Sequence, residues 1–339
     1  MAPGAAPVRT LTGLFVLASA VAPGRVPDAA AYVRTRSPNS CVLVAWAQSC
    51  LYVQPDSSLE QTDMTAAEVE QAMQSAVTSW NERLQASSYI RLRLLPPDGP
   101  REVNRVDQLQ VIKFRRETWC RPAQAGRDTP TCFDPAATAV TTVSFLNKPA
   151  DPTLDGRIID ADIDMNAVNY RFYDAKKGPP ALGSSDGRTP VDLWNTLSHE
   201  LGHVLGLEHT CRLDDAPYAC LVTDRGEAVP SCADVELGRR SDSALETVYE
   251  TTMYPTATST ETSRRLPKAD DLAGVVDAYP QGRDPQTCTV PLTLSPTGCS
   301  TGAARGVGSA GLRAGLGLGG LCALGLALRR RRRSARPRG

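Results

Sequence analysis

Histidine is the scarcest residue in this sequence. Only three histidines occur among 339 residues, and all three lie between positions 199 and 209. Any metal or catalytic site that uses histidine must therefore be built in this one stretch. The ten cysteines contain no C-x-x-C pair, which argues against a zinc site made of cysteines.

The central part of the chain, residues 32–299, has no excess of positive charge. The formal net charge is zero, but residues 300–339 hold nine arginines and no acid, so residues 32–299 carry 26 basic and 36 acidic side chains. This acidic body has no basic stripe, and nucleic acid is not an expected partner. With 41% hydrophobic and 22% charged residues, the composition is that of a globular protein.

The stretch with the three histidines predicts half of a zinc site on a helix. His199 and His203 are four residues apart, so both imidazoles can point from one helix face at the same ion. Glu200 projects about 100° further round the helix, where it borders the metal as a base without ligating it. A third ligand must come from beyond the helix, and His209 fits because Gly206 permits the required turn.

These residues spell H-E-x-x-H-x-x-G-x-x-H, and the chain resembles the metzincin peptidases, with the matrixin branch closest. H-E-x-x-H alone occurs by chance on ordinary amphipathic helices, but the added glycine and third histidine argue against chance here. A second motif, Met253-Tyr254-Pro255, follows the third histidine by 44 residues. It is similar to the methionine-bearing turn that lies beneath the zinc histidines in this family.

The resemblance implies an α+β, zincin-like (metzincin) catalytic domain with a twisted, mixed, mainly parallel five-stranded sheet, long helices and a zinc cleft. It implies one catalytic Zn²⁺ on the three histidines, with Glu200 as the base. Met253 would pack beneath the ligands, and Tyr254 and Pro255 would line the pocket for the side chain after the scissile bond. Two features depart from matrixins: no propeptide fits between Ala31 and the first strand, so any latency works differently, and no histidine is left for a second zinc.

Hydrophobic periodicity and turn residues place the other elements. A capping box at Thr65 and Glu68 opens a long amphipathic helix. A central helix begins at Thr189, with Pro190 in its first turn. The expected strands are 42–53, 89–95, 109–114, 139–146 and 157–165, and the expected helices are 66–84, a central helix from 189 through the histidines, and a last one from 267 to 279.

The predicted strand 157–165 alternates acidic and apolar residues. Asp160, Asp162 and Asp164 fall on one face of it. They could contribute to a Ca²⁺ site, but a solvated strand face explains the alternation equally well, and we favour the solvated face.

The cysteines indicate disulfides, as in an exported protein. Cys41 with Cys50 and Cys120 with Cys132 are the pairs closest in sequence. The partners among Cys211, Cys220, Cys232 and Cys288 stay open.

Both ends of the chain resemble export signals. Residues 1–31 carry Arg9, an apolar run and a final Ala-Ala-Ala, which predicts a signal peptide. We divide the rest into a matrixin-like peptidase domain at 32–283, a linker with a Cys motif at 284–304, and an apolar, arginine-rich tail at 305–339.

That tail resembles the MYXO-CTERM sorting tails of surface proteins. It holds only 15 uncharged residues in a row, from Ala314 to Leu328, fewer than the roughly 20 that span a bilayer. The resemblance implies that the tail is removed and that Cys299 is a lipid-attachment site. The alternative is a plain C-terminal membrane anchor. Either places the chain outside the cytoplasm, secreted or attached to the outer cell surface.

The predicted function is zinc-dependent hydrolysis of internal bonds in protein or peptide substrates by a monomeric enzyme. The alternatives are a non-catalytic surface binding module stabilised by zinc and a zinc hydrolase with non-peptide substrates. The intact Glu200 favours catalysis, because a structural zinc site needs no base.

Overall fold

The computed structural model describes residues 32–288 except 62, 106, 124–128, 179–185 and 214–219, all within the unit Met1–Ser295. The expected signal peptide, the sorting tail and most of the linker lie outside the described residues. No helix in the described part of the chain is long and apolar enough to cross a membrane.

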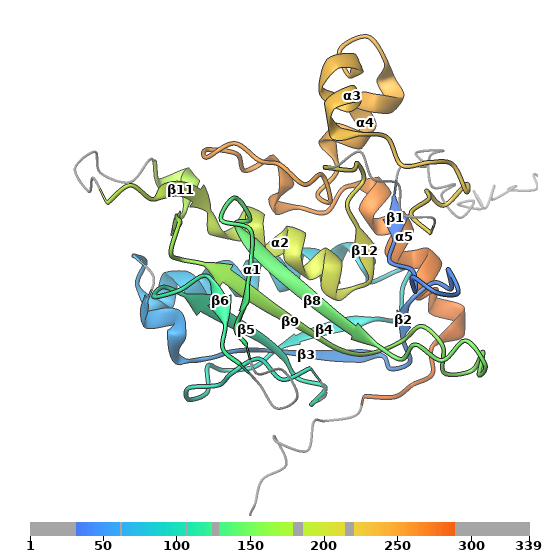
Figure 1. Cartoon of the computed structure of the whole chain (residues 1–339), viewed down its shortest axis with the longest axis horizontal. Helices are drawn as coiled ribbons and strands as arrows, with labels where there is room; N and C mark the ends of the chain where they lie inside the picture. Colours follow the sequence, from blue (N-terminus) through green and yellow to red (C-terminus); the bar gives the residue numbers. More distant parts are fainter. Residues whose placement is uncertain are drawn as a thin grey trace, which may run out of the picture. The chain divides into compact units, whose positions relative to one another are not determined.

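A six-stranded sheet forms the centre of the described unit (Figure 1). Its strands are β2 (Ala45–Trp46), β3 (Cys50–Pro55), β4 (Arg91–Leu94), β5 (Gln110–Arg115), β8 (Ala139–Phe145) and β9 (Arg157–Asn166). Five of them pair in parallel in the order β2-β9-β5-β3-β4, and β8 pairs antiparallel with β9. A mixed, mainly parallel sheet was expected, but with five strands; the predicted strand 42–53 is in fact two strands that are not neighbours.

Two long helices, α1 (Ala66–Leu84) and α2 (Leu193–Val204), pack against each other over one face of this sheet (Figure 1). The predicted bounds and capping box of α1 are confirmed. The predicted start of α2 at Thr189 is wrong. Residues 189–192 pair in parallel with residues 170–173, and the helix begins only after Asp192, whose side chain accepts the N–H of Asn195 at 2.8 Å.

The core between the sheet and the two helices holds α2 in place. Trp80 of α1 is fully buried and donates its indole N–H to the carbonyl of Ser198 in α2 at 3.0 Å. Trp46 of β2 donates its indole N–H to the carbonyl of Val204 at 2.7 Å. Both ends of the predicted metal-binding turn of helix are therefore tied to large buried aromatic side chains.

The opposite face of β9 carries the three aspartates. Ala161, Ile163 and Met165 join the core beneath the helices, so Asp160, Asp162 and Asp164 point to the other side, where they are 0%, 1% and 0% exposed. The solvated-face interpretation is therefore wrong. Asp164 pairs with Arg115 and Arg121, and the strands β6 (Cys120–Arg121) and β7 (Thr131–Cys132) contribute to the layer that covers this face.

The remaining helices follow the histidine stretch. Helices α3 (Cys232–Gly238) and α4 (Ser243–Glu250) stand apart from the sheet at the top of Figure 1, within the insertion that showed no periodicity in sequence. The other elements are β1 (Val33–Arg34), β10 (Tyr170–Tyr173), β11 (Thr189–Asp192), β12 (Leu207–Glu208), α5 (Ala269–Ala278) and the short 3₁₀ helices Ser57–Gln61, Ala175–Lys177, Ser263–Arg265 and Gln281–Arg283.

Four disulfides join the described cysteines. The bridges are Cys41–Cys220, Cys50–Cys288, Cys120–Cys132 and Cys211–Cys232. The predicted pair Cys120–Cys132 is confirmed, and the pair Cys41–Cys50 is wrong. Because β2 and β3 are not neighbours in the sheet, the chain between these two cysteines does not fold back as a hairpin, and each meets a partner far away in sequence.

Candidate metal centre

Helix α2 presents two of the three histidines on its face away from the core. Leu193, Leu197 and Leu201 are buried at helical spacing against the sheet and α1. His199 and His203 therefore share the face that remains.

A glycine turn brings back the third histidine. Gly206 has φ +90°, a conformation that side chains other than glycine rarely adopt, and its N–H closes the helix on the carbonyl of His203 at 2.9 Å. The chain then continues as β12, which pairs antiparallel with β1. This pairing directs His209 toward the helix.

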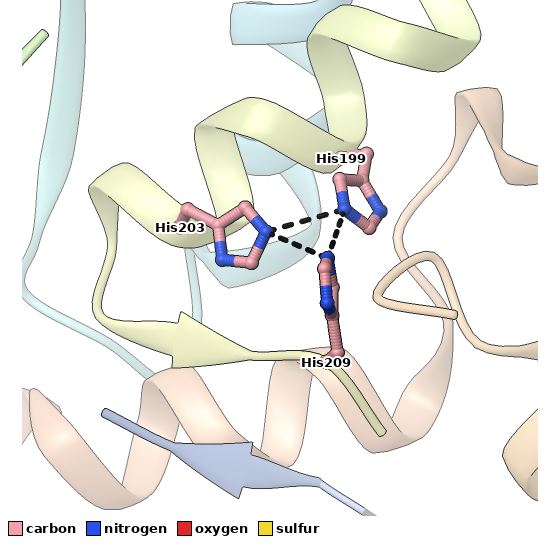
Figure 2. A group of neighbouring side chains, drawn as sticks. All are labelled: His199, His203 and His209. Carbon is pink, nitrogen blue, oxygen red and sulfur yellow. Dashed lines mark hydrogen bonds between the residues drawn. The ribbon is translucent and has the colours of Figure 1, made fainter. Parts of the chain in front are cut away.

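The three imidazoles converge on one point (Figure 2). Their Nε2 atoms lie 3.1 Å apart for His199 and His209, and 3.2 Å apart for His203 with either of the other two. Among the described residues, these three are the one group of His, Cys, Asp or Glu side chains whose ligand atoms gather closely enough to hold an ion.

Hydrogen bonds at Nδ1 fix the tautomer of two of the rings. Nδ1–H of His199 donates to the carbonyl of Thr252 at 2.7 Å, and Nδ1–H of His203 donates to the carbonyl of Leu207 at 2.8 Å. With the proton on Nδ1, both Nε2 atoms turn a lone pair inward. Burial lowers the pKa of His199 to about 3 and that of His209 well below its ordinary value, which favours neutral rings.

Lone pairs in such close contact repel one another unless a cation lies between them. Three nitrogens around a tetrahedral Zn²⁺ at about 2.05 Å would be about 3.3 Å apart, close to the observed spacing. Three imidazoles, with no fourth ligand among the described residues, suit zinc in an open site, as well as other imidazole-preferring metals. The residues therefore fit a bound metal ion whose identity the geometry leaves open.

Glu200 lies beside this group and outside it. The residue is 5% exposed, and its Oε2 accepts the hydroxyl of Thr141 on β8 at 2.6 Å. Burial raises the pKa of Glu200, and the nearby His203 and the Thr141 hydrogen bond act in the opposite direction. A carboxylate in this position can exchange a proton with a group bound at the histidines.

Met253 packs directly beneath the helix that carries the ligands. Its side chain is 1% exposed, and its Sδ occupies the space that a Cβ on Gly202 would need. Gly202 lies between His199 and His203, so the thioether supports the helix at the level of the two histidines.

A buried carboxylate holds the backbone of the methionine turn. Asp271 of α5 is fully buried and accepts the N–H groups of Thr252 at 2.9 Å, Met253 at 3.2 Å and Lys268 at 2.8 Å. The carbonyl of Thr252 also accepts the Nδ1–H of His199, so Asp271 helps to position the His199 ring through Thr252.

The two proposed pocket residues are less open than expected. Tyr254 is 1% exposed, and its hydroxyl donates to Glu236 of α3 at 3.2 Å. Pro255 is partly exposed. A cavity of about 660 Å³ lies on another side of the site, bordered by His209, Glu208, Arg36 and Arg212.

The sequence pattern did not identify three residues that contribute to this site, namely Gly202, Asp271 and Thr141. A glycine inside a helix weakens it, so Gly202 carried a signal of close packing. Asp271 appeared only as an acid in the first turn of a helix, and nothing in the pattern distinguished Thr141 from other strand residues.

Comparison with known proteins adds little. No protein-family model matches the chain, and no curated protein matches its sequence. Among solved structures, the chain is similar to metalloproteinase-II from Bacteroides fragilis, with 12% identity and a TM-score of 0.29 over 69% of this chain. The match covers 54% of that protein, about half of its length. At this TM-score the likeness carries no weight for function, and the matrixin resemblance has no support from a sequence match.

Proposed function

We propose that the chain is an exported, zinc-dependent endopeptidase. The observation that carries this proposal is the convergence of three histidine ring nitrogens, with a buried carboxylate beside them that is not one of the ligands. A purely structural metal site is usually closed by a fourth protein ligand and has no use for this carboxylate.

The proposed reaction divides the work between the ion and the chain. When bound at His199, His203 and His209, Zn²⁺ supplies Lewis acidity toward a water molecule and a peptide carbonyl. Glu200 accepts the proton of the attacking water and then returns it to the amine nitrogen that leaves. The carbonyls of Thr252 and Leu207 keep two of the rings in the tautomer that ligation requires.

The edge strand β8 supports a peptide as the substrate. Among the described strands, β8 pairs with β9 alone, which leaves its other backbone edge open. Through Thr141 this strand also reaches the catalytic-site candidate Glu200. An extended peptide that hydrogen-bonds to such an edge is held through its backbone, largely independently of its sequence.

Export is supported by the four disulfides, which are typical of proteins that fold outside the cytoplasm. The signal peptide, the sorting tail and surface attachment through Cys299 stay predictions.

The test uses the chain produced by export, with its disulfides formed and zinc added. The protein is incubated with a diverse peptide mixture, and products are identified by mass spectrometry. The variant Glu200→Gln removes the base but keeps the side-chain shape, and Glu70→Gln, on the exposed side of α1, is the matched control. We expect cleavage by the wild type and the control, none by Glu200→Gln, and loss of cleavage with a chelator.

Equal cleavage by Glu200→Gln would refute the assigned base. No cleavage by the wild type, with one zinc bound per chain, would favour the non-catalytic binding module instead.

A further inference from the structure

The carboxylate of Glu200 is held from the edge strand. Oγ1 of Thr141 lies 2.6 Å from Oε2 of Glu200 and 3.3 Å from the backbone carbonyl of the same residue. Both oxygens are acceptors, so the threonine hydroxyl is the donor. A backbone hydrogen bond from Thr141 also acts on this carboxylate, so both contacts come from one residue of β8.

The donor is itself rigid. Thr141 lies in the middle of β8, opposite Ile163 of β9, and the seven residues of β8 are paired along the strand. A β-branched side chain on a paired strand has few χ1 rotamers, so its hydroxyl has a defined position. Glutamate, in contrast, has three rotatable bonds and needs an outside contact to stay in one rotamer.

We propose that Thr141 is a positioning residue that holds Glu200 in the rotamer from which its carboxylate reaches the attacking water. This inference rests on the proposed function, in which Glu200 is the base. Thr141 does not touch the reacting atoms; it acts through the carboxylate. Since β8 is also the proposed seat of the peptide, one strand would position both the substrate and the base.

A purely structural role would be to fasten β8 to α2, and the variants separate the two roles. Thr141→Val keeps the shape and the β-branch but removes the donor, whereas Thr141→Ser keeps the donor. Thr142→Val is the matched control, because the neighbouring threonine lies opposite Asp162 on the other face of the same strand.

The experiment uses the exported, zinc-loaded enzyme and measures kcat and KM on the peptide that the wild type cleaves best. For Thr141→Val we expect kcat to fall by about tenfold or more, the range for one lost hydrogen bond to a charged group. We expect its KM to stay within about twofold, because ground-state binding is unchanged. Zinc content and Tm should match the wild type, Thr141→Ser should recover most of kcat, and Thr142→Val should behave as the wild type.

Crystal structures of the zinc-loaded variants provide a second, independent readout. We expect the Glu200 carboxylate to leave its rotamer in Thr141→Val and to keep it in Thr141→Ser. An unmoved carboxylate in Thr141→Val, or an unchanged kcat, would overturn the proposal. If the wild type cleaves no peptide, the proposed function fails, yet the position of Glu200 still decides the role of Thr141.

Discussion

Replacing Gly202 by alanine tests whether Met253 supports the metal-binding helix. An added Cβ would overlap Sδ of Met253 and would lie 3.2 Å from its Cε and 3.4 Å from Cζ2 of Trp80. Neither neighbour has room to move, because Met253 is 1% exposed, its backbone is held by Asp271, and Trp80 is fully buried. Overpacking of this kind costs about 3 kcal/mol at the upper end of its usual range.

Alanine is also a better helix former than glycine by about 1 kcal/mol, so the free energy of unfolding should fall by about 2 kcal/mol. For a domain of this size the corresponding fall in Tm is about 4–8 °C. Displacement of His199 and His203 should also weaken zinc binding by about tenfold or more.

The assay is thermal unfolding of the metal-free protein with its disulfides intact, followed by a competition titration for zinc. Gly238→Ala is the control, because its Cβ would meet only a terminal methyl of Leu245, which can rotate away. We expect no loss of stability for that variant. A Gly202→Ala protein with unchanged Tm and unchanged zinc affinity would refute the packing argument.

Two further predictions concern buried carboxylates. Burial and the neighbouring Asp160 raise the pKa of Asp162. Above about pH 4 the folded chain therefore binds more protons at this site than the unfolded chain does. The free energy of unfolding should fall as the pH rises above about 4. Asp162→Asn should therefore raise Tm at pH 8 in calcium-free buffer and bring little change near pH 4; a lower Tm at pH 8 would contradict this sign. Asp271→Ala leaves three N–H groups, two of them buried, without an acceptor and should lower the free energy of unfolding by about 3 kcal/mol or more, measured with denaturant. Asp277→Ala, on the same helix, removes a half-exposed partner of the buried Arg34 and should cost less, and equal losses would argue against the role of Asp271.

Features that depend on a few neighbouring residues could be predicted from the sequence. The capping box at Thr65 and Glu68 sets the start of α1, because both of its hydrogen bonds form within one turn. The spacing of His199, His203 and Gly206 likewise contains most of the geometry that brings the ring nitrogens together, since a helix and one positive-φ turn determine it.

Features that depend on distant residues could not be predicted in the same way. Thr189 and Pro190 are good residues for a helix start, but they pair with Tyr170 and Arg171, and this tertiary pairing overrides the local preference. Cys50 is the cysteine closest to Cys41 in sequence, but Cys41 pairs with Cys220. Strands β2 and β3 are not neighbours in the sheet, so the chain does not bring Cys41 and Cys50 together.

The three aspartates of β9 show why a correct pattern can still be misread. A period of two says that alternate residues face opposite sides of the sheet, and this holds for Asp160, Asp162 and Asp164. It says nothing of what lies over each side. Here the polar side is buried as deeply as the apolar one, so both faces of the sheet are covered. Helices α1 and α2 cover the apolar face. On the other face, the buried carboxylates are either paired with arginines or have a raised pKa that favours the protonated form. The metal site lies on the apolar side. Its side chains are therefore positioned by close packing around Gly202 and Met253 and by the hydrogen bonds of Asp271 and Thr141.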